Sequence, residues 1–227
     1  MSAFRMKTLF KNNALFIALS LILAVVLGLA LLYVQKGELH LLLCDRHTPA
    51  RDIFYKYYTQ VAEWFPYVVC VCLLLFSRIG DGVCASAAMI FSALTTQLFK
   101  HIINAPRPLT WFEQNLPDIQ LPLVEGVRMN YWFSFPSGHT TSFFALAFVV
   151  SIVATKKLHG PWTVAIQLVL FIAAMLGAYS RIYLSQHFSS DVLAGIVVGV
   201  LVSILSYAIF MRFEDKKWYN YRVFSKK

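Results

Sequence analysis

Three short polar clusters interrupt an otherwise apolar sequence, and each contains residues that could bind an anion. The first cluster, KHIINAPRP, spans residues 100–108 and directly follows a long apolar run. It supplies Lys100 and Arg107, and the prolines on either side of Arg107 restrict the loop that presents this arginine. Cations at such a position either anchor the end of a helix or are gathered to hold a negatively charged group.

The second cluster, FPSGH, spans residues 135–139 and favours the start of a helix. Pro136 suits the first helical turn, and Gly138 lets the backbone come close to a ligand. The free N–H groups of a first turn, together with the helix dipole, form an anion site. Ser137 would add a hydroxyl group and His139 a titratable ring. An ordinary helix start looks the same, so this cluster alone leaves both interpretations open.

The third cluster, SRIYLSQHFSSD, spans residues 180–191 and contains a histidine, an aspartate and an arginine. His187 and Asp191 are four residues apart, which would place them on one helical face. A carboxylate beside an imidazole fixes its tautomer and leaves the other ring nitrogen free to attack. Arg181 offers a guanidinium fork that fits two phosphate oxygens at once.

The elements that must position these clusters are membrane helices. Of the 227 residues, 59% are hydrophobic and 14% are charged, whereas a soluble domain carries roughly a quarter charged residues. We therefore expect an all-α, integral membrane six-helix bundle that forms a single domain over residues 1–227. A membrane-spanning helix needs about 20 mostly apolar residues. The expected spans are residues 14–34, 61–77, 82–99, 139–155, 162–179 and 191–211.

The first of these spans is expected to be an uncleaved helix, because its apolar run is longer than that of a signal peptide. The net charge of +9 does not indicate nucleic-acid binding, since basic residues of membrane proteins collect in cytoplasmic loops. Residues 35–60 and 109–134 mix charged and aromatic side chains, which is typical of segments at the membrane interface.

The distribution of basic residues predicts the orientation. If the N-terminus is cytoplasmic, twelve basic residues fall on the inner side and eight on the outer side. The inner set is Arg5, Lys7, Lys11, Arg78, Lys156, Lys157, Arg212, Lys216, Lys217, Arg222, Lys226 and Lys227. The outer set is Lys36, Arg46, Arg51, Lys56, Lys100, Arg107, Arg128 and Arg181. The excess inside predicts that both termini are cytoplasmic and that all three polar clusters face outward.

Together the clusters indicate phosphoryl transfer. Ionisable residues near the centre of a bilayer cost about 2.5–3.5 kcal/mol each, so such residues point to a functional site. Two arginines, a lysine, a helix N-terminus, a serine and two histidines would meet on one face. Phosphoryl transfer depends chiefly on positioning and on electrostatic stabilisation, which these groups can provide.

The same residues resemble the three signature motifs of the type 2 phosphatidic acid phosphatase (PAP2) family, which includes membrane lipid phosphatases and soluble vanadium haloperoxidases. All three motifs are complete, in the expected order and spacing. They are Lys100-x6-Arg107-Pro108, Pro136-Ser137-Gly138-His139 and Ser180-Arg181-x5-His187-x3-Asp191. The resemblance covers residues 82–211, and a six-span layout is also the membrane form of this family. The spans exclude a soluble haloperoxidase.

The resemblance implies a role for each signature residue. His187 would be the nucleophile that forms a phosphohistidine, and Asp191 would orient it. His139 would protonate the leaving group and then activate water. The phosphate oxygens would be held by Lys100, Arg107, Ser137, Gly138 and Arg181. No cofactor or metal is expected, and Asp118 and Glu125 are too isolated to form a metal site.

The expected function is hydrolysis of a terminal phosphate from a membrane lipid. Relatives in the resembled family act on undecaprenyl pyrophosphate, phosphatidylglycerol phosphate or lipid A phosphates, and the sequence does not choose among them. A lipid phosphotransferase would carry the same motifs. An anion transporter fits less well, because the polar residues lie at one face and no half-broken helix is evident. The expected location is a bacterial inner membrane, with the site facing the periplasm. The expected partners are the lipid phosphate substrate and the bilayer, and the sequence assigns no oligomeric state.

Overall fold

The computed structural model of the protein describes residues 3–223, which form helices and loops and contain no strand. Lys226 and Lys227, which were counted on the inner side, lie outside the described residues. The helices are α1 (Ala3–Asn12), α2 (Ala14–Tyr33), α3 (Lys36–Cys44), α4 (Pro49–Tyr58), η1 (Thr59–Ala62), α5 (Trp64–Ser77), α6 (Ile79–Ile103), α7 (Pro108–Asn115), α8 (Gly138–Thr155), α9 (Pro161–Tyr183), α10 (Ser189–Phe210), η2 (Met211–Phe213) and α11 (Lys217–Asn220).

Five of these segments are long and apolar enough to cross a membrane, and a bent pair of helices makes a sixth. The pair joins residues 49–62 to residues 65–77 at an angle of 47°. Glu63 is extended between the two parts, and Pro66 lies in the first turn of α5, where proline is tolerated. The prediction of an all-α membrane bundle is confirmed, but the expectation of unbroken helices is wrong for this segment.

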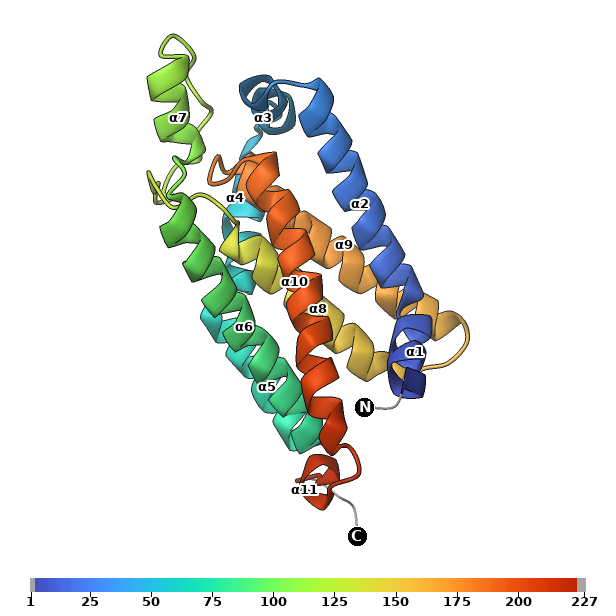
Figure 1. The fold of residues 1–227 in the computed structure, drawn as a ribbon. Coiled ribbons are helices and arrows are strands. Elements are labelled where there is room, and N and C mark those ends of the chain that lie inside the picture. The colour runs from blue at the N-terminus through green and yellow to red at the C-terminus, as the bar shows by residue number, and fades with distance from the viewer. Residues whose placement is uncertain (1–2, 224–227) are drawn as a thin grey trace.

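Helix α8 lies at the centre of the bundle and is the most buried of the five long segments. It contacts α6, α9 and α10, while α5 packs against α6, and α2 packs against α9 and α10 (Figure 1). The first turn of α8 is therefore held by three neighbours. A group placed there is fixed relative to the ends of all of them.

Aromatic rings and small residues bring these helices together. Phe16 of α2 stacks on Phe148 of α8 with ring centroids 5.2 Å apart, and Phe171 of α9 meets Phe16 edge-on at 6.2 Å. Helix α9 comes close to α8 at Gly177, where any Cβ would collide with the ring of Phe143. The absence of a side chain at this glycine permits the approach. These contacts fill the interior next to the polar end of α8.

The bundle has two distinct ends. Helices α3 and α7 lie at one end, and α1 and α11 lie at the other (Figure 1). At the α1 end, Asp81 accepts from Arg78 at 2.7 Å and from Lys156 at 2.8 Å, which ties α6 to α8. The three polar clusters of the sequence lie at the opposite end, where the loops between α6 and α8 and between α9 and α10 meet.

Candidate active site

The second polar cluster caps the central helix. Ser137 is the N-cap of α8, and its Oγ accepts from the backbone N–H of Thr140 at 3.4 Å and from the Thr140 hydroxyl at 2.9 Å. Serine is a preferred N-cap residue for this reason. Because α8 begins at Gly138, Pro136 precedes the cap instead of occupying the first turn. The sequence-based position of this proline is corrected accordingly.

The third cluster places its histidine and aspartate in contact through a capping turn. Helix α10 begins at Ser189, so His187 lies before it and Asp191 lies within its first turn. The Asp191 carboxylate accepts from the backbone N–H of Phe188 at 3.0 Å. His187 Nδ1 and Asp191 Oδ2 are 3.4 Å apart. The two residues are neighbours, as expected, but the prediction that they share a helical face is wrong.

A serine outside the predicted motifs completes this pair. The Ser134 hydroxyl donates to Asp191 Oδ2 at 2.5 Å and lies 3.5 Å from His187 Nδ1. Both contacts are on the Nδ1 side of the ring, which leaves Nε2 to face a ligand. Burial lowers the pKa of His187 to about 3, so its ring is neutral at neutral pH. A neutral imidazole with a free Nε2 has the form that a nucleophile requires.

Arg107 is held firmly by backbone and amide oxygens. It is buried, and its Nε donates to Trp132 O at 3.0 Å. Its Nη1 donates to Gln186 O at 3.2 Å and to Gln186 Oε1 at 3.1 Å. The guanidinium group is therefore fixed before any ligand arrives, with little side-chain entropy left to lose.

Arg181 lies at the end of α9, and one of its three guanidinium nitrogens has no partner within residues 3–223. Its Nη1 donates to Thr59 Oγ1 at 2.7 Å, and its Nη2 donates to Gln186 Oε1 at 3.5 Å. Its Nε is buried and has no hydrogen-bond partner among the described residues. One amide oxygen, that of Gln186, thus bridges both arginines.

The remaining predicted residues come within electrostatic range of this pair of arginines. Lys100 lies in the last turn of α6, which ends at the left-handed Asn104, and it interacts with the charges of Arg107, Arg181 and Asp191. His139 interacts with the charges of Arg181, His187, Arg107 and Lys100. The backbone N–H of Ser137 donates to Asp191 O at 3.0 Å, and Gly138 follows it. The structure brings together all eight predicted residues.

Three residues that position the site were missed in the sequence: Ser134, Gln186 and Thr59. Ser134 and Gln186 lie next to residues of the predicted motifs, and this position in the sequence could have indicated that they belong to the site. Thr59 belongs to η1, far from the motifs in sequence, and nothing in its surroundings indicates that it contacts Arg181. Within residues 3–223, no three His, Cys, Asp or Glu side chains are grouped to hold a metal ion.

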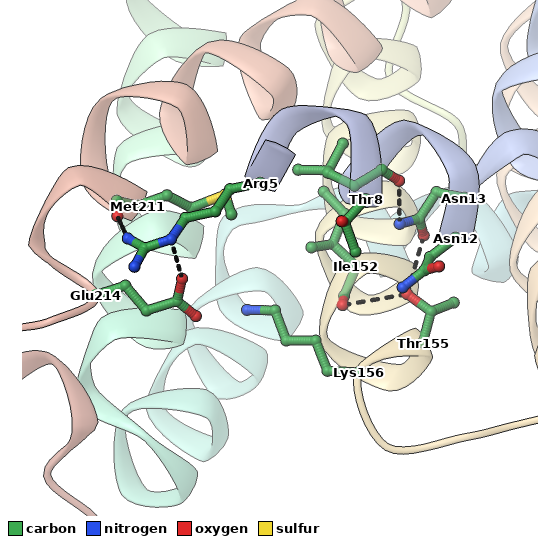
Figure 2. Close-up of a pocket in the computed structure, with 10 residues that line it drawn as sticks. Arg5, Thr8, Asn12, Asn13, Ile152, Thr155, Lys156, Met211 and Glu214 are labelled. Carbon is green, nitrogen blue, oxygen red and sulfur yellow. Dashed lines mark hydrogen bonds and ion pairs between the residues drawn. The ribbon is translucent and has the colours of Figure 1, made fainter. Parts of the chain in front are cut away.

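Two cavities near the ends of the bundle differ in character. One, of about 410 Å³, lies between η1, α5, α6 and α8 and reaches His139. The other, of about 190 Å³, lies between α1, α8 and η2 at the opposite end (Figure 2). Its cations are already paired, since Arg5 contacts Glu214 and Asp215, and Lys156 contacts Asp81. It is thus separate from the site around His187.

The fold and the site together describe an integral membrane protein of one class: a helical bundle that holds a His–Asp pair and three cations at one end. The sequence profile of the PAP2 superfamily matches residues 81–215, which include all eight site residues predicted from the sequence. The match covers more than half of the chain, and the chain belongs to the PAP2 superfamily.

Individual relatives agree with this assignment. The chain is 29% identical to a lipid A 4′-phosphatase of Porphyromonas gingivalis over 60% of this chain and 53% of that protein. It thus spans about half of that relative's length. It is 27% identical to an undecaprenyl-diphosphatase of Sulfolobus acidocaldarius over 69% of this chain and 68% of that protein. A PAP2-type phosphatidylglycerolphosphate phosphatase structure from Bacillus subtilis shares the fold, with a TM-score of 0.65, 22% identity, and coverage of 92% and 100% of the two chains.

Proposed function

We propose that this multi-pass membrane protein is a lipid phosphatase that removes a terminal phosphate through a phosphohistidine intermediate. The named activities of its relatives support a phosphatase, and the arrangement around His187 supports the intermediate. The substrate would be a membrane lipid that carries a phosphate monoester or a diphosphate.

The observation that carries the proposal is a concentration of buried positive charge with an unused donor. Arg107 and Arg181 are 7% and 6% exposed, and Lys100 lies near both. Asp191 is the only carboxylate that contacts His187 among the described residues. Buried charges without partners are costly, so such a group of cations is stabilised when an anion binds. A phosphate would accept from Arg181 Nε and compensate the charge.

In the first step, His187 Nε2 attacks phosphorus and the bond from phosphorus to the leaving oxygen breaks. His139 donates a proton to that oxygen, so the lipid leaves as an alcohol or a phosphate. Asp191 accepts from His187 Nδ1–H and stabilises the positive charge that develops on the ring. Arg107, Arg181 and Lys100 stabilise the negative charge on the phosphoryl oxygens in the transition state.

In the second step, water attacks the phosphohistidine. His139 is now unprotonated and takes a proton from the water as the new P–O bond forms. The P–N bond breaks, inorganic phosphate is released, and His187 returns to its neutral form. The starting protonation state of His139 is restored with the proton from water, so the cycle balances.

The first turn of α8 has room for the phosphate. A Cβ added at Gly138 would meet nothing within 4 Å, although α8 is otherwise tightly packed. By contrast, a Cβ added at Gly195 of α10 would lie 2.9 Å from Ser137 O. Gly138 thus borders open space at the start of α8, and the free N–H groups of a first helical turn can bind an anion.

Phosphate release from a lipid panel tests the proposal. The purified protein would be given phosphatidylglycerophosphate, a lipid A phosphate and undecaprenyl diphosphate in excess EDTA. We expect release of inorganic phosphate from at least one lipid, because the cations of the chain hold the phosphate. Vanadate should inhibit, because it mimics the five-coordinate phosphorus.

An arginine pair provides the matched control. Arg181→Gln should lose activity, whereas Arg212→Gln, at an exposed position on the inner end, should keep it. Activity that is lost on chelation and restored by magnesium or zinc would contradict the mechanism. Phosphate that appears on a second lipid instead of in water would make the protein a phosphotransferase.

We also propose that both termini are cytoplasmic and that the site faces the periplasm. The excess of inner basic residues supports this orientation. In a Cys44→Ser background, Gln120→Cys in the loop after α7 should react with a membrane-impermeant thiol reagent in intact spheroplasts. Lys157→Cys should be protected until the membrane is opened. Lys157 is preferable to Lys156, which is paired with Asp81. If only residue 157 were labelled in intact spheroplasts, the orientation would be the reverse of the proposed one.

A further inference from the structure

The 410 Å³ cavity next to His139 has an unusual lining for a space between membrane helices. Its walls come from η1, α5, α6 and α8, and they carry several polar side chains beside apolar ones. The polar lining residues are Glu63, Tyr67, Ser92, Thr96, Gln97, His139 and Ser142. Its size lies within the roughly 300–1,000 Å³ range of small-molecule sites.

Two buried hydroxyl groups in this lining have no partner. Tyr67 is 2% exposed and Ser92 is 4% exposed, and neither the Tyr67 Oη nor the Ser92 Oγ has a hydrogen-bond partner among the described residues. A buried hydroxyl left unpaired is destabilising, and most buried polar groups in proteins are satisfied. Tyr67 of α5 and Ser92 of α6 both line the cavity, so these two unpaired hydroxyls are the groups nearest to it that a ligand could satisfy.

The charge of the lining distinguishes this cavity from the phosphate site. Among the described residues that line it, none is a lysine or an arginine, and Glu63 contributes a carboxylate. Glu63 interacts electrostatically with Arg181, so the cavity and the phosphate site adjoin each other. A second phosphate group would meet a carboxylate here instead of a cation. Hydroxyl or amino groups would meet complementary acceptors and donors.

We propose that this cavity binds the leaving group of the substrate, and that this group is a hydroxyl- or amine-bearing alcohol of the sugar type. The inference rests on the proposed function, in which His139 protonates the leaving oxygen. Because His139 lines the cavity, the alcohol that it protonates would lie against Tyr67 and Ser92. The preferred substrate is thus a sugar phosphate monoester on a lipid, and a polyprenyl diphosphate is disfavoured.

The test compares two substrates in the purified full-length protein: a lipid-anchored hexosamine phosphate and undecaprenyl diphosphate. The measured quantity is the ratio of kcat/KM for the sugar phosphate to kcat/KM for the diphosphate. We expect a ratio above one in the unchanged protein. Tyr67→Phe should lower this ratio about fivefold, as expected for the loss of one hydrogen bond, and adding Ser92→Ala should lower it further.

Tyr207→Phe is the matched control. Tyr207 is also fully buried with an unpartnered hydroxyl, but it lies on α10 near Lys156, far along the bundle from the cavity. This variant should leave the ratio unchanged. A melting temperature for each variant would identify a protein that has lost its fold, and Tyr67→Phe should melt no lower than the parent because it removes an unsatisfied hydroxyl.

The outcomes separate this inference from the proposed function. Hydrolysis of the diphosphate with little or none of the sugar phosphate would overturn the inference and leave the phosphatase intact. An equal loss on both substrates in Tyr67→Phe would also overturn it, because the hydroxyl would then act on the fold or on the phosphate. Hydrolysis of neither substrate would overturn the proposed function itself.

Discussion

His187→Ala should abolish phosphate release, with kcat falling by more than roughly 10⁴-fold. The expected loss is this large because His187 supplies the nitrogen that attacks phosphorus in the proposed mechanism. The variant should also fail to retain a phosphoryl group on the protein after rapid quenching with base, where phosphohistidine is stable. Phosphate release and protein-bound phosphate would be measured on the same preparation.

His159→Ala is the matched control for this variant. His159 is exposed in the loop between α8 and α9, at the opposite end of the bundle from the site. The turn around His187 is held by backbone bonds, including His187 N–H to Arg181 O at 3.0 Å, so the alanine variant should remain folded. If a folded His187→Ala protein released phosphate at a normal rate, the phosphohistidine mechanism would be wrong.

His139→Ala should affect substrates unequally. A lipid alcohol leaves as a strongly basic alkoxide unless it is protonated, so loss of the acid should slow monoester hydrolysis by about 10²–10⁴-fold. A diphosphate has a weakly basic leaving group, and its first step should slow by about tenfold or less. The measurement is the rate of leaving-group release in a single turnover, for a lipid phosphate monoester and for a polyprenyl diphosphate in the same variant, because the second step is common to both substrates.

An activated monoester gives an independent check of this role. A nitrophenyl group leaves without protonation, so His139→Ala should release a first equivalent of nitrophenol at close to the parent rate, while release of the first equivalent of alcohol from an alkyl phosphate is slowed. Later turnovers should slow on both substrates, because the residue that activates water is missing. Equal losses on every substrate would assign His139 to another step, such as water activation alone.

The features that could be predicted from the sequence are those that depend on local composition and motif spacing. The long apolar runs predict membrane helices because a bilayer requires them, and the spacing within each cluster predicts which side chains gather at one end. The starting residues of the helices were harder to predict. Helix α8 begins at Gly138 with Ser137 as its N-cap, because the serine hydroxyl accepts from a free backbone N–H, and Pro136 lies before the cap.

The parts that could not be predicted depend on the geometry of one helix cap and on contacts between distant segments. His187 and Asp191 meet through the N-terminal turn of α10, which depends on the bond from the Phe188 N–H to the Asp191 carboxylate. Thr59 contacts Arg181 across 122 positions of sequence. No spacing rule links them, because the packing of η1 against α9 exists only in the folded bundle.

The helices that supply the phosphate-binding residues differ in part from those that line the adjoining cavity, and this affects how substrate preference evolves. Of the residues proposed to act on phosphate, α6 contributes Lys100, and α5 contributes none. Six of the eleven residues that line the adjoining cavity come from these two helices, five of them from α6. Substitutions on the cavity side of α5 and α6 thus alter the fit of a lipid without disturbing the catalytic residues. Related proteins can in this way catalyse one reaction on many different lipids. The three motifs then identify the reaction but not the substrate. Sequence differences that determine substrate preference are expected in the α5–α6 hairpin.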